Sequence, residues 1–277
     1  MKSLILTPLL ALAISLPAHG ALLLSENFDN LNTGALNGQN SWSAAGELTV
    51  GDGGLSYSNG DITIAGGARH SVSTGANAQG VASKAFASQS GEVWFSLTLN
   101  VSTTTNSNRF WFHVSDDADL NDSGVIGQTN TSSTALLGGV RIGSSQQSTS
   151  TGISLGSNLG TTFFVVGRYF QAEEGGTATV GDYDSMEVWV NPDSTTLGSG
   201  VASSFTTGSG ITGGIDTFAL SALGGGATVL WDNLLVGTSQ ADVLDVYTST
   251  IPEPSSFAAL GGLAALGLAA AGRRRRR

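Results

Sequence analysis

The sequence of 277 residues contains no cysteine and only 5 prolines, and it carries little positive charge outside its two ends. The absence of cysteine excludes a disulfide framework, thiolate metal sites and a cysteine nucleophile, so stability must come from packing and strand pairing. The 39 glycines follow no three-residue period, which excludes a collagen-like structure. The composition that remains, rich in glycine and poor in charge, favours turn-rich β structure.

Charge is distributed unevenly along the chain. Residues 21–250 contain five basic and 20 acidic residues, a formal charge of −15, whereas the whole chain carries −10. An acidic body disfavours nucleic acid and anionic membrane surfaces as partners. It suits solubility, or contact with divalent cations outside the cell.

Residues 1–20 have the organisation of a secretory signal peptide. Lys2 supplies a positive charge, an apolar run covers 4–16, and Ala18 and Gly20 supply the small residues that precede a cleavage site. The apolar run is too short to span a hydrocarbon core, which needs about 20 residues. We therefore expect an exported protein that uses the Sec machinery and is cleaved by signal peptidase after Gly20.

The segment 251–277 contains three features in order. Pro252, Glu253 and Pro254 form a stiff extended triplet, because proline fixes the backbone. An apolar stretch over 257–272 follows; as a helix it would be about 24 Å long, which makes it a marginal transmembrane helix. The chain ends in five arginines, which are Arg273, Arg274, Arg275, Arg276 and Arg277. The positive-inside rule places these arginines in the cytoplasm and the body of the protein outside.

This order of Pro252-Glu253-Pro254, apolar helix and arginine cluster resembles the PEP-CTERM sorting signal of Gram-negative bacteria. The resemblance implies recognition by an exosortase, a membrane-embedded cysteine transpeptidase that acts near the Pro-Glu-Pro triplet. It also implies inner-membrane anchoring before processing, and then residence at the cell surface or in the extracellular matrix. A plain tail anchor that is never cut remains the alternative, because hydropathy fits it equally well.

Hydrophobic alternation with a period of two predicts the fold of residues 21–250. Half-buried or β-rich strands are predicted at 92–101, 109–114, 161–170, 185–191 and 227–236. Polar, glycine-rich stretches at 128–134 and 143–152 are expected to be loops. Strands without long helices predict an all-β fold, a single antiparallel jelly-roll sandwich.

Three short motifs resemble the concanavalin-like (laminin-G-like) domains found in many PEP-CTERM proteins. They are SENFD at 25–29 together with LNGQNSW at 36–42, EVWVNP at 187–192, and LWDNLLVGT at 230–238. The resemblance implies a single sandwich in which the N- and C-terminal strands of the body pair with each other.

An acidic stretch over 116–124 is a candidate calcium site, and calcium is the one cofactor that the sequence suggests. Asp117, Asp119 and Asn121 supply hard oxygen ligands at the first positions of an EF-hand loop. The match then fails, because Asp122 stands where glycine is required and Gln128 where a bidentate glutamate belongs. Two interpretations stay open, a solvated hairpin loop and a calcium site of another geometry.

Arg109, Trp111 and His113 share one face of the predicted strand 109–114, opposite its apolar face. We expect His113 to be a surface histidine, and the three side chains could form a patch on which a sugar stacks. The alternative is an ordinary solvent-facing side of a sheet. Asp232 lies in phase with Leu230 and Leu234, which predicts either a bulge or a buried, hydrogen-bonded anchor.

The segment 182–187, DYDSME, weakly matches the E-x-D-x-x-E signature of a jelly-roll glycoside hydrolase family. Asp182 replaces the first glutamate, which upsets the carboxyl spacing that a retaining mechanism needs. We therefore expect no enzymatic activity, and predict an exported surface or matrix protein of structural or interaction type. The resemblance to PEP-CTERM proteins implies an association with extracellular polysaccharide. A calcium-assisted carbohydrate-binding module is the alternative, and a glycoside hydrolase is a third hypothesis.

Overall fold

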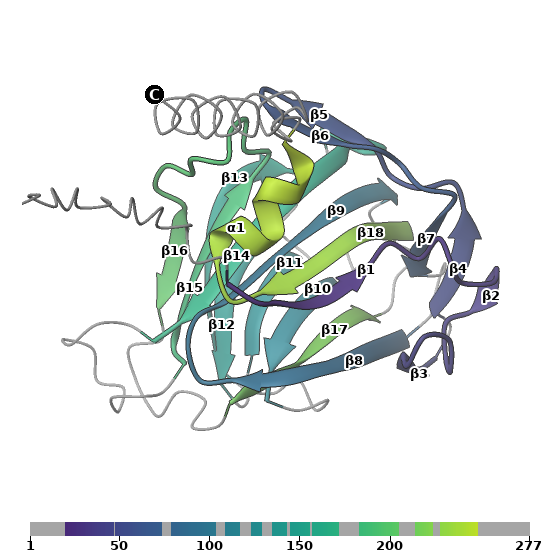
Figure 1. Cartoon of the computed structure of the whole chain (residues 1–277), viewed down its shortest axis with the longest axis horizontal. Helices are drawn as coiled ribbons and strands as arrows, with labels where there is room; N and C mark the ends of the chain where they lie inside the picture. Colours follow the sequence, from purple (N-terminus) through teal and green to yellow (C-terminus); the bar gives the residue numbers. More distant parts are fainter. Residues whose placement is uncertain are drawn as a thin grey trace, which may run out of the picture.

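A computed structural model of the protein describes residues 20–46, 48–73, 79–103, 109–116, 123–128, 135–142, 145–155, 157–171, 183–204, 214–223 and 228–248. These residues form two stacked β-sheets, as Figure 1 shows. The all-β sandwich predicted from hydrophobic alternation is thus confirmed. The predicted segments 1–19 and 251–277 lie outside the described residues. Within the described ranges, no helix has the length and apolar character needed to cross a membrane.

The larger sheet has nine antiparallel strands among the described residues. Eight lie in the order β16 (Val201–Ser204), β15 (Ser185–Val190), β14 (Thr162–Phe170), β9 (Val93–Thr103), β18 (Thr228–Gly237), β7 (Arg69–Ser73), β4 (Leu48–Asp52) and β2 (Gly34–Ala35), while β1 (Leu22–Glu26) pairs with β18. The pairing of β1 with β18, with Leu24 opposite Val236, confirms the expected contact between the first and last strands of the body.

The smaller sheet has seven antiparallel strands in the described part of the chain. Their order is β13 (Ser145–Ser154), β12 (Ala135–Ile142), β11 (Ser123–Gln128), β10 (Arg109–Ser115), β17 (Ile215–Leu223), β8 (Gln79–Gln89) and β3 (Ser43–Ala45). The strand β13 corrects the loop expected at 143–152. This segment is polar on both faces, so it has no hydrophobic alternation, and it forms a strand because it pairs as the sheet edge beside β12.

Three short elements cover the outer face of the larger sheet. They are the hairpin of β5 (Tyr57–Asn59) with β6 (Ile62–Ile64), the helix α1 (Gln240–Leu244) and the 3-10 turn η1 (Asp245–Tyr247). In Figure 1, α1 crosses the sheet over β9 and β18. The helix is short and begins at a capping box, in which Ser239 and Asp242 each accept a hydrogen bond from the backbone of the other.

These layers enclose two apolar clusters. The main cluster fills the space between the sheets and includes Phe95, Phe112 and Trp231. The second lies between the larger sheet and its cover, and includes Phe164 and Leu244. Both faces of β9 are therefore buried, which corrects the half-buried strand predicted at 92–101. Alternation identifies the two faces of a strand, but it does not reveal what packs on the second face.

Candidate functional site

The predicted sugar patch on β10 is not a solvent-facing surface. Trp111 and His113 are only 7% and 2% exposed. The His113 ring bridges two neighbouring strands, because its Nδ1 lies 3.1 Å from Ser123 Oγ and its Nε2 lies 2.9 Å from Ser221 Oγ. The expectation of a surface histidine is therefore wrong. Arg109 belongs to β10, but its side chain lies outside the described part of the structure.

Burial also determines the charge of His113. Desolvation lowers its pKa to about 3, and the positive charge of Arg141 acts in the same direction. The ring is therefore neutral at physiological pH. A neutral ring offers one donor and one acceptor, which matches its two serine partners.

Asp232 is a buried, hydrogen-bonded anchor, which is one of the two alternatives that the sequence left open; the bulge beside it does not turn it outward. Its pairing with β9 shifts register between Asp232 and Leu235, and its side chain is fully buried. The carboxylate accepts hydrogen bonds of 2.8 Å from the backbone N–H groups of Leu55 and Asn233. Burial nevertheless raises the pKa of Asp232 to about 7, and the charges of Asp29 and Glu26 add to this effect. The residue fixes the loop before β5 to the larger sheet.

The opening motif also has a structural role. Glu26 is buried and accepts hydrogen bonds from Lys84 Nζ at 2.8 Å and from Trp42 Nε1 at 3.0 Å. Because Glu26 is on β1 and Lys84 on β8, this ion pair connects the two sheets. Trp42 in turn stacks on Phe28, with ring centroids 5.9 Å apart.

Several predicted site residues fall outside the described residues. They are Asp117, Asp119 and Asn121 of the candidate calcium loop, Asp182 of the hydrolase-like segment, and the sorting residues Pro252, Glu253, Pro254 and 273–277. Within the described ranges, no group of three or more His, Asp or Glu side chains could hold a metal ion. Glu187 of the hydrolase-like segment pairs with Arg168 at 3.0 Å and accepts a hydrogen bond from Gly200 N–H at 2.8 Å, so it holds β15 to its neighbours.

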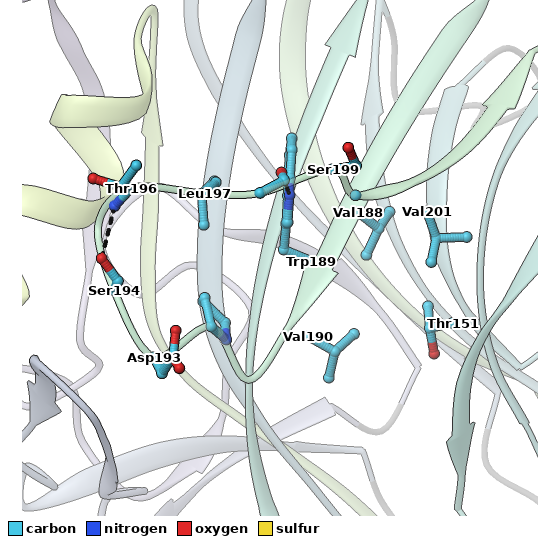
Figure 2. Close-up of a pocket in the computed structure, with 13 residues that line it drawn as sticks. Thr151, Val188, Trp189, Val190, Asp193, Ser194, Thr196, Leu197, Ser199 and Val201 are labelled. Atoms are coloured by element: carbon cyan, nitrogen blue, oxygen red, sulfur yellow. Dashed lines mark hydrogen bonds between the residues drawn. The ribbon is translucent and has the colours of Figure 1, made fainter.

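A cavity of about 250 Å³ lies at the edge of the larger sheet, where the loop 191–200 connects β15 to β16 (Figure 2). Its walls combine apolar side chains with hydroxyls and one carboxylate. The residues concerned are Val188, Val190 and Val201 of the strands, Thr151 of β13, and Trp189, Pro192, Asp193, Ser194, Thr196, Leu197 and Ser199 on or beside the loop.

Hydrogen bonds along its length hold the loop 191–200 in place. These contacts are Asn191 N–H to Phe164 O at 2.7 Å, Tyr57 OH to Pro192 O at 3.2 Å, Asp61 N–H to Asp193 O at 2.8 Å, Gln240 Nε2 to Thr195 O, and Trp189 Nε1 to Gly198 O at 2.7 Å. Since they come from four different elements, the loop is fixed before any ligand arrives. The sequence marks it only as an Asn-Pro turn with glycines, which predicts a loop but not a cavity.

Comparisons with known proteins assign no family. No family model and no curated protein matches the sequence. Among solved structures, the chain is similar to an endo-beta-1,4-glucuronan lyase from the fungus Trichoderma reesei, with a TM-score of 0.48, 10% identity, and coverage of 81% of this chain and 98% of that one. It is also similar to the T. cruzi calreticulin globular domain, with a TM-score of 0.48, 9% identity, and coverage of 79% and 88%. A third is the botulinum neurotoxin serotype C1 binding domain, with a TM-score of 0.45, 12% identity, and coverage of 80% and 50%.

These comparisons correct one expectation. The expectation that the chain has no enzymatic activity is corrected, because one of the solved structures to which it is similar is a lyase. At such low identity the similarity assigns neither a substrate nor a catalytic residue to this chain.

Proposed function

We propose that the chain is an exported surface or extracellular-matrix protein of structural or interaction type in a Gram-negative bacterium. Signal peptidase would remove residues 1–20 after Sec export. The segment 251–277 would then anchor the protein in the inner membrane until an exosortase processes it.

One observation carries this proposal: between the two predicted signals, the first strand of the body pairs with its last strand. Strand β1 begins at Leu22, directly after Ala21, and η1 ends at Tyr247, before the Pro-Glu-Pro triplet. Ala21 N–H donates to Thr238 Oγ1 at 2.8 Å, and Thr238 N–H donates to Ala21 O at 3.1 Å. Removal of both predicted segments would therefore leave β1 and its pairing with β18 in place, which is what processing at both ends requires.

We propose extracellular polysaccharide as the partner of the body. The charge of −15 over 21–250 would repel acidic polymers, so a neutral polysaccharide is the better match.

Calcium at Asp117, Asp119 and Asn121 remains a further proposal. A rise in melting temperature at millimolar Ca²⁺ would support it, and an unchanged melting temperature would count against it.

Fractionation of native cells with and without the exosortase tests the sorting proposal. We expect surface or medium location in the presence of the enzyme and inner-membrane retention in its absence. Replacement of Pro252, Glu253 and Pro254 by alanine should reproduce the retained state, whereas the control Ser255→Ala should not. An identical distribution in both strains would contradict sorting and leave the uncut tail anchor.

A further inference from the structure

One wall of the cavity at the loop 191–200 is the end of β15 that extends beyond its pairing with β16. Asn191 N–H bonds to Phe164 of β14, and successive residues of a strand direct their backbone groups to opposite sides. The N–H and C=O of Val190 therefore point away from β14, toward the loop. Strand β16 pairs with β15 only as far as Val188, opposite Val201. Val190 thus lies beyond the described pairing with β16, and its backbone donor and acceptor face the cavity.

The side chains around this backbone are of two kinds. Val190 and Val201 are half-buried and supply an apolar wall, and Asp193, Thr196 and Ser199 add a carboxylate and hydroxyls on the loop (Figure 2). Asp193, Thr196 and Ser199 are exposed to solvent, so a ligand can reach them without opening the fold. A ligand that fits must present a hydrocarbon face and several hydroxyl groups together, which is the chemistry of a sugar ring.

The charge and the volume of the cavity narrow the class of ligand further. Asp193 is the one charged residue in the lining, and no described cation lines the cavity, so a uronate or a phosphate would meet repulsion without a partner. The cavity volume of about 250 Å³ is smaller than the roughly 300–1,000 Å³ of sites for drug-sized ligands. A single ring therefore fits, and a longer oligosaccharide would have to extend into solvent.

We propose that this cavity binds one neutral pyranose unit, with the Val190 backbone and the Asp193 carboxylate as its polar contacts. This inference rests on the polysaccharide partner proposed above, and it places that contact at the edge of β15 rather than on β10. The loop contacts mean that the site needs little ordering when it binds, which favours affinity.

Saturation-transfer NMR and calorimetry on the purified protein test this site directly. The probes are glucose, galactose, mannose and N-acetylglucosamine, with glucuronate as the acidic comparison. We expect saturable binding of at least one neutral sugar and no detectable binding of glucuronate. Asp193→Asn should weaken the neutral sugar about tenfold, because a carboxylate accepts stronger hydrogen bonds than an amide.

Two matched tryptophan variants separate this cavity from the rest of the surface. Ser199→Trp should fill the cavity and weaken binding at least tenfold, whereas Ser43→Trp, at an exposed position on β3, should leave binding unchanged. Thermal unfolding of both variants checks that each is folded. The proposal is overturned if no neutral sugar binds, if glucuronate binds equally well, or if folded Ser199→Trp binds like the parent protein. Each of these results leaves the sorting proposal untouched, because sorting is measured on the C-terminal segment.

Discussion

Two buried titratable residues have opposite effects on how stability depends on pH. His113 and Asp232 are 2% and 0% exposed, and each is held by hydrogen bonds from neighbouring strands or loops. For both, desolvation is the main cause of the pKa shift, and it disfavours the charged form. Because one is a base and the other an acid, their contributions to stability change in opposite directions.

The first prediction concerns His113. Its pKa is lowered from 6.5 to about 3, so between these values the unfolded state binds more protons and stability rises with pH. As pH falls below 6.5, the native protein should lose up to about 1.4 kcal/mol per pH unit relative to His113→Gln, which does not titrate. Urea unfolding at pH 4.5 to 7.5 measures this difference. Parallel curves for the two proteins would show that His113 is not buried in its neutral form.

The second prediction concerns Asp232. Its pKa is raised from 3.8 to about 7, so the folded state holds a proton that the unfolded state releases, and this contribution to stability is lost as pH rises toward 7. Asp232→Asn should therefore be most destabilising near pH 4 and progressively less so toward pH 7.5. Thermal unfolding of both proteins across this range measures the trend. A constant difference between them would contradict the burial of an ionisable carboxyl at this bulge.

At the scale of elements, the sequence predicted the strands better than their surroundings. The predicted segments 109–114 and 185–191 match β10 and β15 within a residue. Local alternation determines these strands, because each has one face that packs in the core. The burial of His113 and the outer cover of β9 depend on residues distant in sequence, so no local pattern could reveal them. The cavity beside Val190 was missed for the same reason, since its walls come from β13, β15, β16 and the loop.

The Phe95 ring packs closely over Gly167 of β14, its partner across the sheet, and this contact leads to a prediction. A Cβ at this position would lie 2.4 Å from Phe95 Cζ, whereas a Cβ at Gly91 would meet no atom within 4 Å. Gly167→Ala should destabilise the protein by about 1–3 kcal/mol because it overpacks the core. Gly91→Ala should stay within about 0.5 kcal/mol of the parent. Urea unfolding of both variants is the measurement, and equal stabilities would show that β14 does not pack as described.

At the scale of the whole molecule, the chain consists of a closed β-sandwich between two predicted targeting segments. The body is held by two apolar clusters and by the buried Glu26–Lys84 pair between the sheets. Its acidic character and the cavity at the loop 191–200 are the features from which we propose a neutral sugar as its partner. In the proposed function, export, release and sugar contact belong to separate parts of the chain.

The intact mass of the protein recovered from the native cell surface, with and without the exosortase, tests the central claim most directly. The account predicts a chain that begins at Ala21, and that ends near Pro252–Pro254 only when the enzyme is present. A mass that retains the arginines 273–277 in both strains would contradict sorting. A mass that retains residues 1–20 would contradict export by a cleaved signal peptide.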